Sequence, residues 1–165
     1  MNMSVLSMNK VSYQYKEARQ PVLSQIEQEF EAGKFYAIIG KSGSGKSTLL
    51  SLLAALDNPT SGKILFEGED IQEKGDSYHR KHHISLVFQN YNLIDYLTPL
   101  ENIRLVNPTA TKEILLQLGL EERLEAEIGL LSGGQRQAVS LLMATLRTPE
   151  LLLLDEHTAA LDPKT

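Results

Sequence analysis

A glycine-rich segment in the first third of the chain has the residue types that hold the phosphates of a nucleotide. Residues 40–48 match the pattern G-x-x-x-x-G-K-[ST], with a buried-strand pattern before them and a helical pattern after them. Glycines let backbone N–H groups curl around phosphate oxygens, and a helix N-terminus adds partial positive charge. Lys46 would bridge the β- and γ-phosphates, and the Ser47 hydroxyl would reach Mg²⁺. The alternative is a glycine-rich turn that only opens a helix. The predicted phosphate-binding residues are Gly40, Lys41, Ser42, Gly43, Ser44, Gly45, Lys46, Ser47 and Thr48.

A second glycine-containing segment, Leu131-Ser132-Gly133-Gly134-Gln135, has two roles to weigh. Ser132 and Gln135 have the spacing of a capping box, so the segment could simply begin the helix that follows. Two adjacent glycines, however, weaken the start of a helix that other residues would open better. They are explained if backbone amides must approach a ligand closely, and we expect the segment to serve both purposes.

An acidic pair follows four leucines near the end of the sequence. Asp155 and Glu156 come directly after Leu151–Leu154, a run typical of a strand buried on both faces. The pair could be a strand end that meets solvent. It could also be a metal ligand followed by a carboxylate that polarises a water for in-line attack on a phosphate. Taken alone, the pair leaves both interpretations open.

The order and spacing of these three segments resemble the ATP-binding cassette (ABC) family of transport ATPases. The resemblance runs from Val5 to Asp162 and implies an ATPase subunit that uses ATP and Mg²⁺. It also implies that two nucleotide-binding domains, identical or different, close head to tail around two ATP molecules. Transmembrane permease subunits are then partners, and through them the chain is expected to be cytoplasmic and peripheral on the inner face of the cell membrane. The residues implied to contact the γ-phosphate held by the other domain are Ser132, Gly133, Gly134 and Gln135.

The resemblance further implies roles for single residues. Asp155 matches the carboxylate that holds the Mg²⁺ shell, and Glu156 matches the residue that polarises the attacking water. Gln89 matches the family's Q-loop glutamine, a contact of the metal and of water. The implied catalytic residues are therefore Glu156, Lys46 and Gln89. The implied metal contacts are Ser47, Gln89 and Asp155.

An aromatic ring for the adenine base is expected from the N-terminal part. Tyr15 lies 25 residues before Gly40, where the family has the ring that stacks on adenine. A ring face suits a flat base whatever its edge chemistry. Tyr13 competes for this role, because alternation along a strand would put both rings on the same face. We expect Tyr15 to be the adenine contact.

These residues need a scaffold in which strands and helices alternate. Helices are predicted from Leu49 to Leu56, from Pro99 onward, before Gly119 and along the stripe 138–146. The predicted fold class is therefore α/β: a P-loop NTPase core with a mostly parallel sheet, an antiparallel N-terminal β part and a short helical subdomain. Strands are predicted over residues 5–8, 11–15, 26–30, 35–39, 63–71, 84–88 and 151–155.

We expect one cassette domain over residues 1–165. Its parts would be the core at 1–89, the helical subdomain at 90–147, and the strand and D-loop at 148–165. The family's switch histidine lies on a strand later than Thr165, so the resemblance implies a C-terminally incomplete cassette. A nucleotide-binding module with little hydrolysis is therefore the alternative function, and a soluble family member outside transport is a further one. Within the family, the stretch Leu52–Ser61 is similar to the subgroup that serves exporters of lipoproteins, macrolides and antimicrobial peptides, whereas the segment from Leu131 to Thr165 is at least as similar to import-type ATPases.

Composition excludes several other classes. The 165 residues carry a net charge of −5, are 42% hydrophobic and include no Cys. A wholly disordered chain, a disulfide framework and a thiolate metal site are thus excluded, and the acidic balance gives no reason to expect nucleic acid as a partner. The basic run over residues 78–83 reads as a solvated loop rather than a metal site, because no carboxylate partner lies at a suitable spacing.

Overall fold

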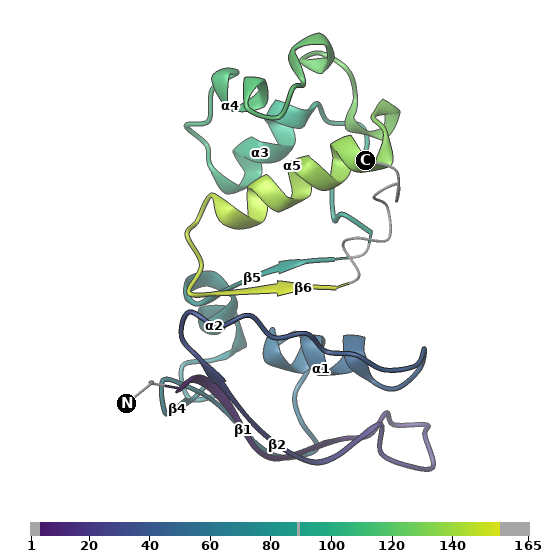
Figure 1. Ribbon diagram of the computed structural model, residues 1–165, viewed down its shortest axis with the longest axis vertical. Coiled ribbons are helices and arrows are strands. Elements are labelled where there is room, and N and C mark those ends of the chain that lie inside the picture. Colours follow the sequence, from purple (N-terminus) through teal and green to yellow (C-terminus); the bar gives the residue numbers. More distant parts are fainter. Residues whose placement is uncertain (1–3, 89, 156–165) are drawn as a thin grey trace. The chain divides into compact units, whose positions relative to one another are not determined.

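A computed structural model describes residues 4–88 and 90–155 of the chain (Figure 1). The chain divides into two compact units, residues 1–83 and residues 84–165, here called the N-terminal and C-terminal units. The N-terminal unit contains the phosphate-binding loop, and the C-terminal unit contains the segment that begins at Leu131. The predicted subdivision into parts ending at residues 89 and 147 stays a prediction.

An antiparallel sheet forms much of the N-terminal unit. Its strands are β1 (Ser4–Tyr13), β2 (Leu23–Glu31), β3 (Ser61–Phe66) and β4 (Glu69–Asp70), in the order β2-β1-β3-β4. Gly62 shows how closely β1 and β3 approach, since a Cβ at this position would lie 2.3 Å from the carbonyl oxygen of Lys10. The sheet contributes Leu6, Met8, Val11, Ile64 and Phe66 to the buried residues of the unit.

Two helices complete the N-terminal unit, α1 (Lys46–Leu53) and α2 (Asp76–His82). The prediction that the first helix reaches Leu56 was wrong. Ala54 caps α1, Ala55 has a left-handed φ of 51°, and the N–H of Leu56 turns back to the carbonyl of Ser51. The predicted solvated basic loop was also wrong: residues 76–82 are helical, and His79 is only 1% exposed.

The predicted buried strand at residues 35–39 is a further correction. The described structure gives these residues no strand, and Phe35 and Ile39 are 88% and 92% exposed. A continuous apolar run forms a buried strand only where it joins a sheet whose two faces are both covered. Each of the four strands in the N-terminal sheet pairs instead with another strand of that sheet.

The C-terminal unit combines a parallel strand pair with helices. β5 (Ile84–Val87) pairs in parallel with β6 (Leu151–Leu154), and Ile84 is opposite Leu151. Three helices follow β5 along the chain: α3 (Pro99–Val106), α4 (Glu113–Leu116) and α5 (Gly133–Thr145). α5 contacts both β5 and α3 (Figure 1). The helical side encloses a core of Leu100, Ile103, Leu115, Leu120, Ile128 and Val139.

Short sequence patterns correctly predicted where two helices of the C-terminal unit begin. The capping box of Thr98 and Glu101, with Pro99 in the first turn, starts α3 as predicted. Ser132 and Gln135 likewise form the predicted capping box of α5. Together the antiparallel N-terminal sheet and the parallel β5–β6 pair confirm the α/β fold class. None of the helices described in the structure has the length and apolar character needed to cross a membrane.

Candidate functional site

The phosphate-binding loop has a backbone that depends on glycine. Gly43 and Gly45 have φ values of 77° and 92°, in the left-handed region that side chains rarely adopt. A Cβ on Gly45 would also lie 2.9 Å from Cγ1 of Val22, so packing excludes a larger residue there. The backbone conformation of the loop therefore requires glycine at these two positions.

The N-terminus of α1 follows this loop and is open to an anion. Gly45 caps α1 without a side-chain hydrogen bond, and the first turn holds no acidic residue. The first amides of a helix lack partners within the helix, and their dipoles favour a negative ligand. By contrast, α3 and α5 each have a capping box. An N-terminus without a side-chain cap, directly after a glycine-rich loop, is suited to a phosphate.

Lys46 folds back over the same loop. Its Nζ donates to the carbonyl oxygens of Gly40 and Lys41, at 3.1 and 3.2 Å. Neutral carbonyls are weaker partners than a charged phosphate, so the ammonium can exchange them for phosphate oxygens. Ser47 is the next residue of α1, and its side chain is exposed. The predicted roles of both residues are compatible with this arrangement and stay predictions.

The two tyrosines of the N-terminal part have different environments. β1 ends at Tyr13, which is 7% exposed, and its hydroxyl donates to the carboxylate of Asp57. That hydrogen bond raises the pKa of Tyr13 to about 12. Tyr15 lies beyond the strand and is 49% exposed, so the expected strand alternation does not extend to it. Its hydroxyl lies 2.8 Å from Oγ1 of Thr48. Of the two rings, that of Tyr15 is available to a ligand.

The segment that begins at Leu131 turns directly into the N-terminus of α5. The N–H of Gln135 donates to Oγ of Ser132 at 3.3 Å, and the N–H of Ser132 donates to Oε1 of Gln135 at 3.0 Å. Gly134 is not required by the local backbone: its φ is not left-handed, and a Cβ there would meet no atom of the described chain within 4 Å. Open space at a glycine on a helix N-terminus is what the approach of a ligand would require.

The acidic pair is only partly described. Asp155 follows β6, and its N–H donates to the carbonyl of Val87 at 3.0 Å, which extends the pairing of β6 with β5. Its side chain is half-buried rather than fully solvated. Glu156 and Gln89 lie outside the described residues, as does the D-loop at 159–162. Their roles remain predictions from the sequence.

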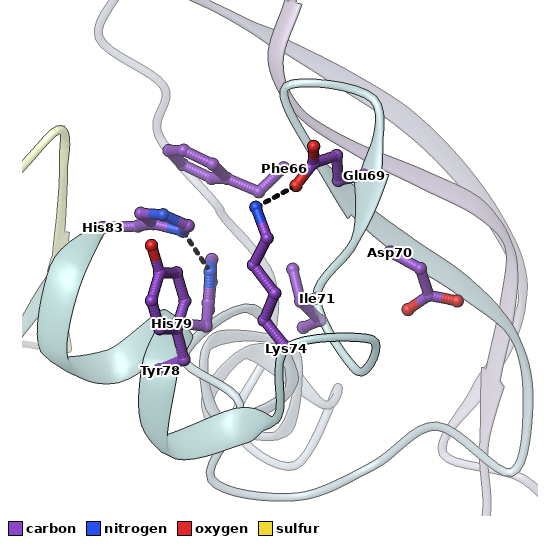
Figure 2. Close-up of a pocket in the computed structure, with 8 residues that line it drawn as sticks. All are labelled: Phe66, Glu69, Asp70, Ile71, Lys74, Tyr78, His79 and His83. Atoms are coloured by element: carbon purple, nitrogen blue, oxygen red, sulfur yellow. Dashed lines mark hydrogen bonds and ion pairs between the residues drawn. The ribbon is translucent and has the colours of Figure 1, made fainter.

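A small pocket lies elsewhere in the N-terminal unit, between β3, β4 and α2 (Figure 2). Its volume is about 20 Å³, which is room for a water molecule and far below the volume of a nucleotide site. At its floor Nδ1 of His79 lies 3.1 Å from Nδ1 of His83. Glu69 and Lys74 form an ion pair at its rim. The pocket is therefore a feature of packing and not a second substrate site.

Sequence reasoning missed a set of contacts between α5 and the segment that precedes α3. Buried Ser140 donates to the carbonyl of Tyr91 at 2.8 Å, and the guanidinium of Arg136 lies 5.4 Å from the centre of the Tyr91 ring. Asn102 is 0% exposed and bonds the backbone of Ile94. For α3 the signal was a polar residue, Asn102, on an otherwise apolar face. Ser140 gave no such signal, because it lies on the side of α5 opposite the predicted apolar stripe.

Comparison with known proteins places the chain among transport ATPases. A profile described as "ABC transporter" matches residues 23–159. The chain is 38% identical to the uncharacterized ABC transporter ATP-binding protein YclH of Bacillus subtilis, over 99% of this chain and 77% of that protein. It is 39% identical to the lipoprotein-releasing system ATP-binding protein LolD of Geobacter metallireducens, over 99% of this chain and 78% of that protein.

Solved structures agree with the sequence comparison. The dimeric structure of MJ0796, a bacterial ABC transporter cassette, matches with a TM-score of 0.81 and 31% identity, over 96% of this chain and 77% of that chain. A second dimeric structure of MJ0796, in a post-hydrolysis state bound to ADP and Pi, matches with a TM-score of 0.79. The chain therefore belongs to the ABC transporter family, as one of its ATP-binding proteins, which are ATPases.

Proposed function

We propose that two copies of this chain, or one copy and a related chain, close head to tail around two ATP molecules and drive transport through separate membrane subunits. The observation that carries the proposal is that two helix N-termini of this chain, those of α1 and α5, each begin at glycines. α1 follows the glycine-rich loop with no side-chain cap, and α5 has Gly134 with free space in front of it. Each is suited to the phosphates of a nucleotide.

The phosphate-binding loop would hold ATP through charge and backbone donors. The Lys46 ammonium would leave the carbonyls of Gly40 and Lys41 for the β- and γ-phosphates. Tyr15 would place its exposed ring against adenine while its hydroxyl stays beside Thr48. In the paired state, the α5 amides of the second chain would face the γ-phosphate, with Ser132 as the capping residue.

Hydrolysis would use oxygen donors that suit Mg²⁺. Mg²⁺ prefers oxygen ligands, and the hydroxyl of Ser47, the carboxylate of Asp155 and the amide oxygen of Gln89 supply that chemistry. A bound Mg²⁺ would neutralise charge that develops on the phosphate oxygens. Glu156 would take a proton from the attacking water, with Gln89 helping to orient that water. Separation of the two chains after hydrolysis would then reset the membrane subunits.

The partners and location follow from the same assignment. The substrate pathway would lie in transmembrane permease subunits, with this chain peripheral on the inner face of the cell membrane. LolD is named as part of a lipoprotein-releasing system, and that likeness supports an exporter-type partner. The net charge of −5 gives no attraction to nucleic acid, so a role on DNA or ribosomes is disfavoured.

A complementation experiment tests whether the two half-sites act between chains. Lys46→Ala damages the phosphate-binding loop, whereas Gly134→Asp puts a carboxylate in front of α5. Because Gly134 has open space and acidic residues suit a helix N-terminus, the second variant should fold normally. Each purified variant alone should hydrolyse little ATP in the presence of Mg²⁺.

Mixing the two variants gives the decisive result. A mixed dimer has one site in which an intact Lys46 meets an intact α5 N-terminus, so phosphate release should recover to a large fraction of one site's rate. The controls are the two variants assayed separately, each at the same total protein concentration as the mixture. No recovery, despite mixed dimers detected by differential tags, would contradict sharing between chains. No turnover by the unmodified full-length protein would favour a nucleotide-binding module.

A further inference from the structure

The segment that joins β5 to α3, residues 90–98, is held in an unusual backbone conformation. Tyr91 and Asn92 have φ values of 57° and 53°, so two successive non-glycine residues are left-handed. Such residues persist only where their surroundings fix them. In this segment, called the connecting segment below, the fixing contacts come from two directions.

α5 holds the start of the connecting segment. Ser140 is buried on α5, and its Oγ donates to the carbonyl oxygen of Tyr91 at 2.8 Å. About one helical turn closer to the N-terminus of α5, Arg136 places its guanidinium 5.4 Å from the centre of the Tyr91 ring. The left-handed residue Tyr91 is therefore bound by both its backbone and its ring to one helix.

The turn before α5 holds the end of the connecting segment. The N–H of Ile128 donates to the carbonyl of Leu97 at 2.8 Å, and the N–H of Gly129 donates to the carbonyl of Asp95 at 3.0 Å. A Cβ at Gly129 would lie 3.3 Å from that Asp95 oxygen, so glycine permits the close approach. The same turn runs into Leu131 and Ser132, where α5 begins.

Buried Asn102 braces the middle of the connecting segment. Its amide accepts from the N–H of Ile94 at 2.8 Å and donates to the carbonyls of Ile94 and Thr98, both at 3.1 Å. With contacts at its start, middle and end, the connecting segment and the N-terminal half of α5 are one hydrogen-bonded body. A shift of the connecting segment must therefore carry Ser132 and Gly134 with it.

We infer that Ser140 is a positioning residue for ATP hydrolysis: its hydrogen bond to Tyr91 fixes where the N-terminus of α5 stands in the paired state. The inference rests on the proposed function, because that N-terminus matters only if it meets ATP held by another chain. Phosphoryl transfer depends on placement of donors, and a displacement of about 1 Å can cost orders of magnitude in rate. Ser140 itself touches no substrate.

Ser140→Ala tests this role in the full-length protein. The variant removes one neutral hydrogen bond, so kcat for ATP should fall roughly 2- to 10-fold. The Kd for ATP of the unpaired chain should stay unchanged, because the phosphate-binding loop lies in the other unit. Ser140→Thr keeps a hydroxyl and should restore most of kcat. Amide exchange over residues 91–97 should quicken in Ser140→Ala alone.

Thr145→Ala is the matched control on the same helix. Within the described residues, the Thr145 hydroxyl bonds the carbonyls of Leu141 and Leu142 in its own helix, so this variant should leave kcat and the exchange at 91–97 unchanged. Equal kcat values for Ser140→Ala and Thr145→Ala would overturn the inference. The complementation experiment distinguishes failure of the proposed function from failure of the positioning role. If the mixed Lys46→Ala and Gly134→Asp chains recover activity and Ser140→Ala has no effect on kcat, only the positioning role is refuted.

Discussion

The hydroxyl of Tyr15 lies 2.8 Å from Oγ1 of Thr48, which ties an exposed aromatic ring to the last residue of the phosphate-binding loop. Thr48 belongs to the first turn of α1, so the ring is held close to the helix N-terminus expected to receive phosphate. The neighbouring ring of Tyr13 packs edge-on against it, with ring centres 5.0 Å apart. Tyr13 is buried and bonded to Asp57, and it supports the Tyr15 ring from one side.

Tyr15→Ala should weaken ATP binding by roughly 5- to 100-fold, because base–aromatic stacking contributes about 1–3 kcal/mol. Tyr15→Phe keeps the ring and loses only the Thr48 contact, so its affinity should stay close to that of the unmodified chain. Isothermal titration with ATP measures both values. Tyr96→Ala, which removes an exposed tyrosine of the other unit, is the control. An unchanged affinity in Tyr15→Ala would contradict the assignment of Tyr15 as the adenine contact.

Lys46→Ala should also weaken ATP binding, but through the phosphates. A charge-assisted contact contributes about 1.5–3 kcal/mol, which corresponds to a loss of roughly 10- to 100-fold in affinity. The loss should be similar for ATP and for other nucleoside triphosphates, because the base is not involved. Lys81→Ala removes an exposed lysine of the same unit and should bind ATP normally. Full affinity in Lys46→Ala would remove the phosphate-binding assignment.

Elements that depend on local signals could be predicted from the sequence. The capping boxes of Thr98 with Glu101 and of Ser132 with Gln135 each need only residues three apart, and both form as expected. The same holds for β6, whose leucine run pairs with β5 over its full length. The glycines of the phosphate-binding loop were predicted for the same reason, since their φ values are a property of the loop itself.

Features that depend on partners could not be predicted in this way. Residues 35–39 have the composition of a buried strand, yet none of the described strands of the N-terminal sheet pairs with them. His79 looks like a solvated residue in the sequence, but contacts from Phe66, His83 and the end of α1 bury it. The bond from Ser140 to Tyr91 joins residues 49 positions apart, and no spacing rule reveals it.

Glu156→Gln should bind ATP with near-normal affinity and lose turnover in the full-length protein. The amide keeps the volume and an acceptor oxygen but cannot take a proton from water. If hydrolysis normally separates the two chains, ATP with Mg²⁺ should hold this variant as a dimer on size-exclusion chromatography. Glu150→Gln, a change shortly before β6, is the charge-matched control. Near-normal phosphate release by a monomeric Glu156→Gln chain would show that Glu156 is only the solvated end of a strand.

The paired histidines of the pocket give the N-terminal unit a pH-dependent contact (Figure 2). Nε2 of His79 lies 3.2 Å from the carbonyl of Leu53, the last residue of α1, and a carbonyl can only accept, so Nε2 carries the proton. Nδ1 of neutral His79 then accepts from Nδ1–H of His83 at 3.1 Å. Burial lowers the pKa of His79 below its usual 6.5, because the charged ring loses hydration.

The free energy of unfolding should therefore fall as the pH drops below about 6.5. In that range the unfolded chain takes up a proton at His79 that the folded chain refuses, so acid favours unfolding until the folded-state pKa is passed. The carboxyls of Glu69, Glu101 and Glu113 have lowered pKa values, so their contribution to stability is lost as the pH falls through their ordinary value of 4.5, mostly below the range of His79.

His79→Gln tests the assignment, because the amide can still donate to the Leu53 carbonyl but does not titrate. Urea unfolding followed between pH 7.5 and about pH 5 should show a shallower loss of stability with acid in His79→Gln than in the unmodified chain. His82→Gln is the matched control: His82 is exposed on the same helix, and among the described residues its ring contacts Tyr78, by a hydrogen bond to the carbonyl and by stacking. It should keep the full pH dependence. The same slope in His79→Gln as in the unmodified chain would assign the acid sensitivity to another group, because the only proton uptake removed by this substitution is that of the ring bonded to α1.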